Sequence, residues 1–497
     1  MARKKKTQVP ATPQARLRSV IDSARKTMRK DAGLNGDLDR IPQFAWLLFL
    51  KAFDGLEMER EIVEDDYRPA IEAPFRWRDW AADRINGRTG DDLLGFVEDE
   101  LFPYLCELKG DTVRDPRDVL ATVFKETYNR MVSGYLLSDV IEQVNKVDFT
   151  SSEDIHTMAL LYESMLREMR DAAGDSGEFY TPRPVIRFMV QMIDPRLGEI
   201  VLDPACGTGG FLVETLEHLL PQVSTVAERE ELAENLRGVE KKPLPYLLGT
   251  MNLLLHGLSR PNLIRGNALA RPLTEIKRAE KVDVIVTNPP FGGEEEKSIL
   301  TNFPAGTQTA ETAWLFMQLV QRMLRDGGRC AIVAPNGVLF AEGAGARIKE
   351  SLLTNCNLHT VVRLGSGVFA PYTDIPSNLL FFEKNGPTEE VWFYEIPTPD
   401  DRKKYSKTRP MRFDEFSDCV EWWGGAPRLG RAESERAWRV DLAAVADSGW
   451  NLDLKNPNRA EDLAHRPPEE LIADLLEAEN EIVALLRGLE AEFGSAK

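Results

Sequence analysis

The chain has 497 residues, of which 43% are hydrophobic and 29% are charged. This length predicts two or three domains, and the composition excludes a fully disordered or fibrous protein. Asp and Glu outnumber Lys and Arg by 80 to 62, giving a formal net charge of -18, which argues against a chain that wraps nucleic acid by itself, because phosphates favour basic surfaces.

The first 30 residues have the opposite charge to the rest of the chain. They hold ten Lys and Arg residues against one acidic residue, Asp22. Such a segment can be an arm that touches nucleic acid, although a solvated chain end is the commoner explanation of the same pattern. Both interpretations stay open at this point.

The pattern of cysteines indicates a reducing compartment, and the apolar segments are too short for a membrane span. Five cysteines are scattered without a CxxC pair, so neither a disulfide framework nor a zinc cluster is expected, and the five dispersed histidines suggest no other metal. No signal peptide is visible. The strongest apolar run, Ala45–Phe53, is too short to span a bilayer and contains Lys51. We expect this run to be a buried helix, and the protein to be cytoplasmic without a membrane segment.

Residues 12–170 have the pattern of helices. Near the end of this region an apolar stripe recurs at steps of three and four, which places its members on one helix face: Ile155, Met158, Tyr162, Met165 and Met169. The stretch Gly174–Gly177 then interrupts the helical pattern.

From about residue 178, short apolar strands alternate with helical stretches. The predicted strands are Ile200–Leu202, Val282–Thr287, Arg329–Val333, Val361–Arg363 and Leu379–Phe382. This alternation predicts an α/β fold with a parallel-type sheet and helices on both faces. After Lys384 we expect an irregular stretch, rich in Pro, Trp and charge, to about residue 465.

A last helix is predicted after Pro467 and Pro468. Its heptad stripe consists of Leu471, Leu475, Ala478, Ile482, Leu485 and Leu489. The stripe could pack on its own domain or on a partner's helix, and the pattern favours neither. The predicted organisation is thus a helical domain (1–150), a catalytic domain (151–385), an irregular extension of that domain (386–465) and a C-terminal helix for subunit contact (466–497).

The first motif with chemical meaning runs from Asp203 to Phe211 and reads DPACGTGGF. It lies between an apolar strand and a helical stretch, where glycines let the backbone approach a ligand closely. It fits neither the dinucleotide pattern nor a phosphate loop. An acidic residue at this position would repel phosphate but suits a cationic ligand such as the sulfonium of S-adenosylmethionine.

The second motif, Asn288-Pro289-Pro290-Phe291, directly follows the predicted strand at 282–287. The prolines end the strand and hold Asn288 at the carboxyl edge of the sheet, where ligands bind in open α/β folds. The Asn288 side-chain oxygen and the Pro289 carbonyl can accept the two N–H bonds of an exocyclic amine. Phe291 offers a face on which a base can stack.

These motifs and their order resemble the amino-methylating DNA methyltransferases, specifically the modification (M, HsdM) subunit of type I restriction–modification systems. The resemblance extends over about residues 12–460. It rests on Gly177–Arg183 (GEFYTPR), DPACGTGGF, Asn252–Gly257 (NLLLHG), NPPF, Val368–Tyr372 (VFAPY), Leu379–Phe382 (LLFF) and Asn451–Pro457 (NLDLKNP).

The resemblance implies a role for each matching residue. Those that it places at the S-adenosylmethionine pocket are Tyr180, Thr181 and Pro182 at the methionine end, Asp203, Gly207, Thr208 and Gly209 in the cofactor loop, Glu240 at the ribose hydroxyls and Asn267 at the adenine. Asn288, Pro289, Pro290 and Phe291 match the catalytic motif that binds the target amine. Phe369 is the candidate for a second aromatic contact to the flipped base.

The implied reaction is transfer of a methyl group from S-adenosylmethionine to adenine N6 of a base flipped out of duplex DNA. The resemblance also implies a separate specificity (S) subunit, with two M subunits per S, and restriction (R) subunits in the full complex. Alternatives are an RNA-base or protein methyltransferase, or a non-catalytic scaffold of a defence complex. The absence of a Walker A loop in this sequence excludes the ATP-driven subunit.

Overall fold

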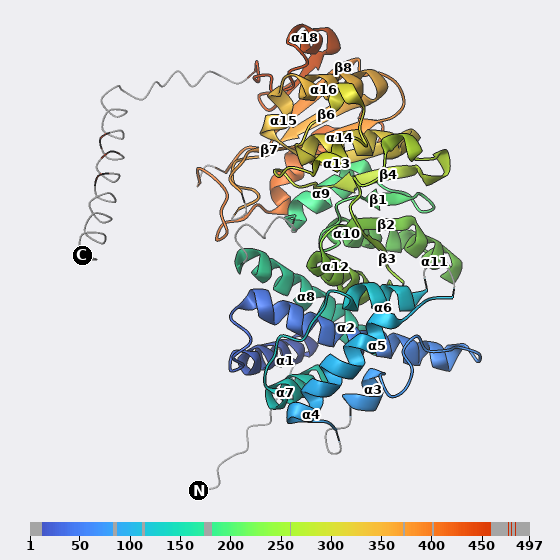
Figure 1. Cartoon of the computed structure of the whole chain (residues 1–497). Helices are drawn as coiled ribbons and strands as arrows, with labels where there is room; N and C mark the ends of the chain where they lie inside the picture. The colour runs from blue at the N-terminus through green and yellow to red at the C-terminus, as the bar shows by residue number, and fades with distance from the viewer. Residues whose placement is uncertain are drawn as a thin grey trace.

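The computed structural model describes residues 12–82, 87–111, 115–172, 181–258, 260–370, 373–399 and 402–458, together with Leu476, Glu479 and Val483. A layer of helices from the first third of the chain lies below a sheet with its own covering helices (Figure 1). Two predictions lie wholly outside the described residues: the stretch Gly174–Gly177 and the heptad stripe of the last helix. The domain boundaries stay predictions.

The region predicted to be helical consists of helices joined by loops in its described part. Its helices are α1 (Pro13–Met28), α2 (Asp37–Val63), α3 (Trp77–Trp80), α4 (Gly90–Gly95), α5 (Phe102–Glu107), α6 (Pro116–Phe124), α7 (Gly134–Asn145) and α8 (Ser152–Ala172), with the π-helical turn η1 (Phe96–Leu101) between α4 and α5. Side chains of Thr12, Asp115 and Ser133 accept backbone hydrogen bonds at the starts of α1, α6 and α7. These caps satisfy N–H groups that would otherwise lack partners.

Helix α2 contains the apolar run that was predicted to be a buried helix, and this prediction is confirmed. Every residue from Ala45 to Phe53 except Lys51 is buried. The Lys51 ammonium donates to the Asn145 carbonyl oxygen at 3.1 Å, and burial lowers the pKa of Lys51 to about 8. Among the described residues, no helix is both long and apolar enough to cross a membrane.

The sheet has nine strands in the order β3-β2-β1-β4-β5-β7-β6-β8-β9. Their bounds are β1 (Val201–Asp203), β2 (Leu236–Glu240), β3 (Asn262–Arg265), β4 (Val282–Thr287), β5 (Leu324–Pro335), β6 (Asn357–Arg363), β7 (Ser377–Glu383), β8 (Glu390–Glu395) and β9 (Ala437–Asp441). Neighbours from β3 to β5 are parallel, as are β6 and β8. β7 runs antiparallel between β5 and β6, and β9 is antiparallel to β8.

All five predicted strands are present, but the prediction of an irregular stretch after Lys384 is wrong. That stretch supplies β8 and β9, which extend the same sheet. The sequence reasoning also missed β2 and β3. Both β3 and β9 are short strands at the sheet edges, where one-sided pairing and partial exposure weaken the apolar pattern that identifies a strand.

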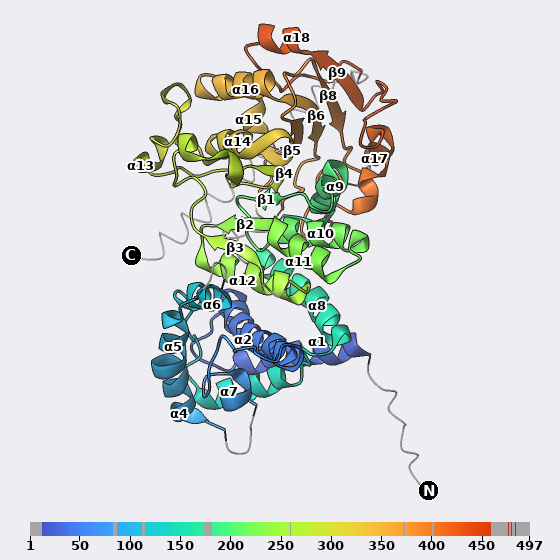
Figure 2. The same cartoon turned by 90° about the vertical axis from the view of Figure 1, so that its right-hand side faces the viewer.

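Helices cover both faces of the sheet, as predicted. Val284 and Val286 point into one core with α9 and α10, whereas Ile285 between them points into another with α14 and α16. The centre of strand β4 is therefore apolar on both faces. Figure 2 shows α14 and α16 on one side and α9 on the other. The helices of this region are α9 (Arg183–Ile193), α10 (Gly210–Leu219), α11 (Val226–Asn235), α12 (Pro243–Leu255), α13 (Lys297–Leu300), α14 (Thr312–Met323), α15 (Asn336–Phe340), α16 (Ala344–Asn355), α17 (Ser417–Trp423) and α18 (Leu442–Asp447).

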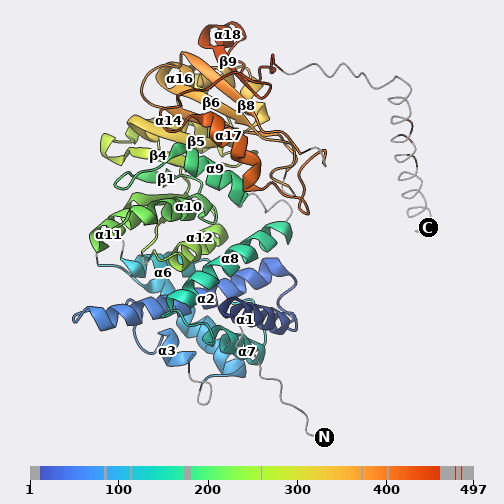
Figure 3. The same ribbon diagram turned by 180° about the vertical axis from the view of Figure 1, so that it is seen from behind.

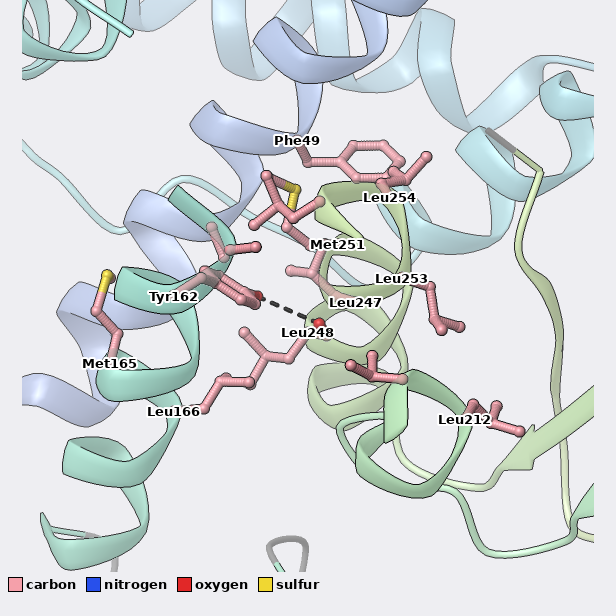
Figure 4. Close-up of a cluster of buried hydrophobic side chains, with 14 of the residues drawn as sticks. Phe49, Tyr162, Met165, Leu166, Leu212, Leu247, Leu248, Met251, Leu253 and Leu254 are labelled. Atoms are coloured by element: carbon pink, nitrogen blue, oxygen red, sulfur yellow. Dashed lines mark hydrogen bonds between the residues drawn. The ribbon is translucent and has the colours of Figure 1, made fainter. Parts of the chain in front are cut away.

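Helix α8 joins the helical layer to the sheet layer through α12. Figure 3 shows α8 beside α12, and Figure 4 shows their apolar side chains meeting. The predicted stripe on α8 is confirmed for Met158, Tyr162 and Met165, which are buried; the Met169 side chain lies outside the described residues. The Tyr162 hydroxyl donates to the Leu248 carbonyl oxygen of α12 at 3.3 Å, so a fully buried polar group gains a partner across the junction.

The basic N-terminal segment is only partly described. Its helical part, α1, uses two arginines on α8: Arg16 is ion-paired with Asp154, and Arg25 bonds Glu168 at 2.5 Å. Residues 1–11, with the first four basic side chains, lie outside the described residues. Part of the positive charge is therefore consumed in holding α1 against α8.

Candidate active site

The carboxyl ends of three adjacent parallel strands bring the two motifs together. β1 ends at Asp203, its neighbour β2 ends at Glu240, and its other neighbour β4 ends at Thr287, immediately before Asn288. Ligands of open α/β sheets bind beyond such carboxyl ends. A single pocket is lined by residues from both motifs, including Thr181, Asp203, Glu240, Asn267 and Asn288.

The glycine loop has the backbone that its sequence predicts. Gly207 and Gly209 have φ values of 52° and 76°, a left-handed conformation that glycine adopts without strain, and α10 begins directly after them. The Glu240 carboxylate accepts a hydrogen bond from the Gly207 amide at 2.9 Å and another from the Lys242 amide at 2.7 Å. Glu240 therefore fixes the loop from the neighbouring strand, and burial raises the pKa of its carboxyl group.

Asp203 and Glu240 are far apart in the sequence but lie at the ends of neighbouring strands. The chain forms α10 and α11 before it returns as β2, yet β1 and β2 pair in register, with Asp203 opposite Gly238. The two acids thus end adjacent strands at the same edge of the sheet.

Asp203 is 1% exposed and lies at the base of the pocket. One carboxylate oxygen accepts from the Thr287 hydroxyl at 2.7 Å and from the Ala205 amide at 3.1 Å. Burial raises the pKa of Asp203 to about 7, and the charge of Glu240 adds to this effect, although the two hydrogen bonds oppose it. The carboxyl group therefore changes charge near neutral pH.

Within the described part of the chain, the side-chain nitrogen of Asn288 has a hydrogen-bond partner and its side-chain oxygen has none. Its amide nitrogen donates to the Thr181 hydroxyl oxygen at 3.0 Å. Its side-chain oxygen is shielded from solvent and accepts no hydrogen bond from any residue in the described part of the chain. A buried acceptor without a donor is costly, and this one lies in the wall of the pocket.

The two candidate aromatic residues lie against each other. The rings of Phe291 and Phe369 are 5.1 Å apart between centroids, with an interplanar angle of 76°. Phe369 is 4% exposed, and Phe291 is partly buried. The structure thus brings Phe369, 78 residues later in the chain, to the aromatic side chain of the NPPF motif.

Asn267 lies in the loop that follows β3, on the far side of Glu240. Gly266 donates its amide hydrogen to the Glu240 carbonyl oxygen at 2.8 Å, and the Asn267 amide donates to Glu295 at 3.2 Å. Lys241 also bonds Glu295, at 3.0 Å. Glu295 was not predicted, because an acid four residues beyond NPPF in a charged loop has no distinguishing pattern.

Of the remaining predicted residues, Pro182 directly precedes α9, Thr208 lies in the glycine loop, and Pro289 and Pro290 follow Asn288. Tyr180 lies outside the described residues. Thr287 and Glu163 are two further residues near the pocket that sequence reasoning missed. Thr287 could have been noticed as the residue between a strand and the Asn of NPPF, whereas Glu163 belongs to a different helix and has no such signal.

Comparisons with known proteins agree with this geometry. The family described as N-6 DNA Methylase matches residues 153–466, and the family described as HsdM N-terminal domain matches residues 17–144. The chain is 49% identical to the type I restriction enzyme EcoEI methylase subunit of Escherichia coli, over 97% of this chain and 98% of that protein. It is 27% identical to the EcoKI methylase subunit of Escherichia coli strain K12, over 83% of this chain and 77% of that protein.

Two solved structures of type I restriction–modification proteins are also similar to this chain in sequence and fold. A modification subunit of a type I restriction enzyme from Vibrio vulnificus YJ016 is 54% identical, with a TM-score of 0.81 over 92% of this chain and all of that one. A chain from a structural study of complex assembly and conformational transition in a type I restriction–modification system is 40% identical, with a TM-score of 0.82 over 98% of this chain and all of that one.

Proposed function

The chain belongs to the N-6 DNA methylase family as a methylase subunit of type I restriction enzymes, and from this membership we propose how its residues methylate adenine N6 in DNA. The pocket at the carboxyl edge of β1, β2 and β4 binds S-adenosylmethionine. Asn288, Pro289, Pro290 and Phe291 bind the flipped adenine beside it.

The residues of the pocket suit this cofactor chemically. Asp203 and Glu240 are acids that suit a cation and a pair of hydroxyl groups, and the left-handed glycines between them let a ligand approach the backbone. We assign Asn267, which lines the pocket, to the adenine end of the cofactor, and Thr181, which accepts a hydrogen bond from Asn288, to the methionine end. When bound, S-adenosylmethionine supplies the methyl group.

One observation carries the catalytic part of the proposal: the unused, buried side-chain oxygen of Asn288. An adenine amino group offers the N–H that this oxygen lacks. The lone pair of the adenine amine is delocalised into the ring, so acceptance of its hydrogens by Asn288 and the Pro289 carbonyl favours a tetrahedral, nucleophilic nitrogen. Phe291 stacks on the base. The protein also excludes water from the site and holds the amine and the methyl group in position to react.

The partners follow from the same membership. We propose that a specificity subunit selects the DNA sequence, that two copies of this chain join one such subunit, and that restriction subunits complete the assembly. The net charge of -18 supports this division of labour, since a chain with an acidic surplus gains from a partner that supplies phosphate contacts.

The test is replacement of Asn288 by Ala in the full chain, assembled with its specificity subunit. We expect loss of N6-methyladenine formation while the affinity for S-adenosylmethionine stays within about twofold, because a contact to the base and not to the cofactor is removed. Asn262→Ala, at the start of edge strand β3, is the matched control and should methylate normally. Near-normal methylation by Asn288→Ala would contradict the proposal.

A further inference from the structure

Three side chains from separate segments meet behind the glycine loop. Glu163 comes from α8, Arg183 from the start of α9 and Asn252 from α12. The Glu163 carboxylate accepts two hydrogen bonds from the Arg183 guanidinium, one of them at 2.9 Å, and a third from the Asn252 amide at 2.8 Å. Two donors that are far apart in the sequence thus share one acceptor group.

Each of these two donors also holds a carbonyl of the glycine loop. The Asn252 amide donates to the Thr208 carbonyl oxygen at 2.9 Å, and the Arg183 guanidinium donates to the Gly210 carbonyl oxygen at 2.9 Å. The two carbonyls lie on either side of Gly209, whose left-handed backbone turns the chain into α10. Both donors are oriented by the same carboxylate.

Burial makes this arrangement sensitive to the loss of one partner. Asn252 is fully buried, and the Glu163 side chain is 12% exposed. Burial works to raise the pKa of Glu163, but the Arg183 charge and the hydrogen bonds from Arg183 and Asn252 together bring it below its usual range. The carboxylate is therefore ionised at neutral pH and can accept all three hydrogen bonds.

Helix α8 connects this cluster to the helical layer. On the side of α12 it contributes Tyr162, Met165 and Leu166 to the apolar junction (Figure 4), and on the other side it receives Arg16 and Arg25 of α1. The position of Glu163 thus depends in part on contacts between α8 and α1 that lie outside the sheet layer.

We propose that Glu163 is a positioning residue for the methylation reaction, acting through Arg183 and Asn252 to hold the glycine loop in the conformation that binds the cofactor. This inference rests on the proposed function, in which that loop binds S-adenosylmethionine. Cofactor affinity then depends on a residue of α8, and therefore on how the helical layer packs against the sheet layer.

The test replaces Glu163 by Gln in the full chain. Gln has the same size, but it carries no charge, and its NH2 group replaces the oxygen that accepts from Nε of Arg183. It therefore turns a donor toward the guanidinium and cannot hold it by an ion pair. We expect the dissociation constant for S-adenosylmethionine, measured by calorimetry, to rise by about tenfold or more, as loss of a buried charged acceptor predicts. With the specificity subunit and saturating cofactor, kcat should stay close to that of the parent.

Glu168→Gln is the matched control on the same helix, because its carboxylate bonds Arg25 and is 47% exposed. It should leave the dissociation constant unchanged. A second measurement is the cycle of Glu163→Gln with Asn252→Ala, whose effects on cofactor affinity should be strongly non-additive if both act through the loop.

Unchanged cofactor affinity in Glu163→Gln, or an equal loss in Glu168→Gln, would overturn the inference while leaving the proposed function intact. A lower kcat with unchanged affinity would also overturn it, because Glu163 would then act on the base and not on the loop. Failure of the parent chain to bind S-adenosylmethionine would instead overturn the proposed function, and this inference with it.

Discussion

The amide nitrogen of Asn288 lies 3.0 Å from the hydroxyl oxygen of Thr181, a residue 107 positions earlier in the chain. This bond determines the orientation of the Asn288 side chain, since the nitrogen is held by Thr181 and only the oxygen remains for a ligand. The segment that precedes the glycine loop thus orients the residue that we propose binds the target amine.

Replacement of Thr181 by Val should therefore impair catalysis. Val has the same shape but no acceptor, so the Asn288 amide can rotate and present its nitrogen to the base. A neutral hydrogen bond is worth about 1 kcal/mol, which corresponds to a roughly fivefold loss of kcat. Single-turnover methylation of DNA by the complex measures this loss. Thr181→Ser keeps the hydroxyl and should restore most of the rate; equal rates in the Val variant and the parent would show that the bond has no role.

Phe291 and Phe369 should act together on the flipped base. Phe291→Ala is expected to abolish methyl transfer and to leave cofactor binding largely intact. Because the rings touch edge to face, Phe291→Leu and Phe369→Leu should show a coupling of about 0.5–1.5 kcal/mol in kcat/KM for DNA. Purely additive effects would remove Phe369 from the base site, and thermal unfolding of each variant controls for lost packing.

Cofactor binding should depend on pH through Asp203. A cationic ligand favours the ionised carboxylate, and the pKa of Asp203 is about 7, so affinity should rise as pH increases through 7 and level off above it. Asp203→Asn should bind weakly and lose this pH dependence. Thr287→Val removes a hydrogen bond that lowers the pKa, and should move the midpoint to higher pH; calorimetric titrations from pH 6 to 8.5 measure both effects.

The same residue should affect stability with the opposite trend. The pKa of Asp203 is higher in the folded chain than its usual value of 3.8, so the folded state binds the proton more tightly than the unfolded state. Its contribution to the free energy of unfolding is therefore complete below about pH 4 and falls as pH rises to 7, by about 1.4 kcal/mol for each unit of raised pKa. Unfolding of Asp203→Asn in urea should show a flatter pH profile over this range; an unchanged slope would contradict the assignment.

Truncation near residue 466 tests the predicted C-terminal helix. If its heptad stripe contacts the specificity subunit, the truncated chain should fold with an unchanged melting temperature but fail to co-purify with that subunit. Undiminished co-purification would show that the contact lies elsewhere.

Residues of both predicted motifs line one pocket, whereas four strands of the sheet were not predicted. Asp203, Gly207 and Asn288 lie in short motifs whose residue types are dictated by local chemistry, and each follows a strongly apolar strand. β8 and β9 were missed because Trp, Arg and Glu alternate with few aliphatic residues there. Glu163 was missed for another reason: its partners, Arg183 and Asn252, are brought to it only by the packing of three helices, which no local pattern records.

The place of β7 in the sheet also constrains how the chain can mature as it is synthesised. β7 is made after β5 and β6 but lies between them, so these two strands have no hydrogen-bonding partner in common until Ser377–Glu383 has emerged. The four adjacent strands β3, β2, β1 and β4, which end at Arg265, Glu240, Asp203 and Thr287, need no later segment to pair with one another. Because domains fold from the N-terminus during synthesis, these four strands can pair on the ribosome first. β7 then pairs with β5 on one side and β6 on the other, and so connects them to β6, β8 and β9.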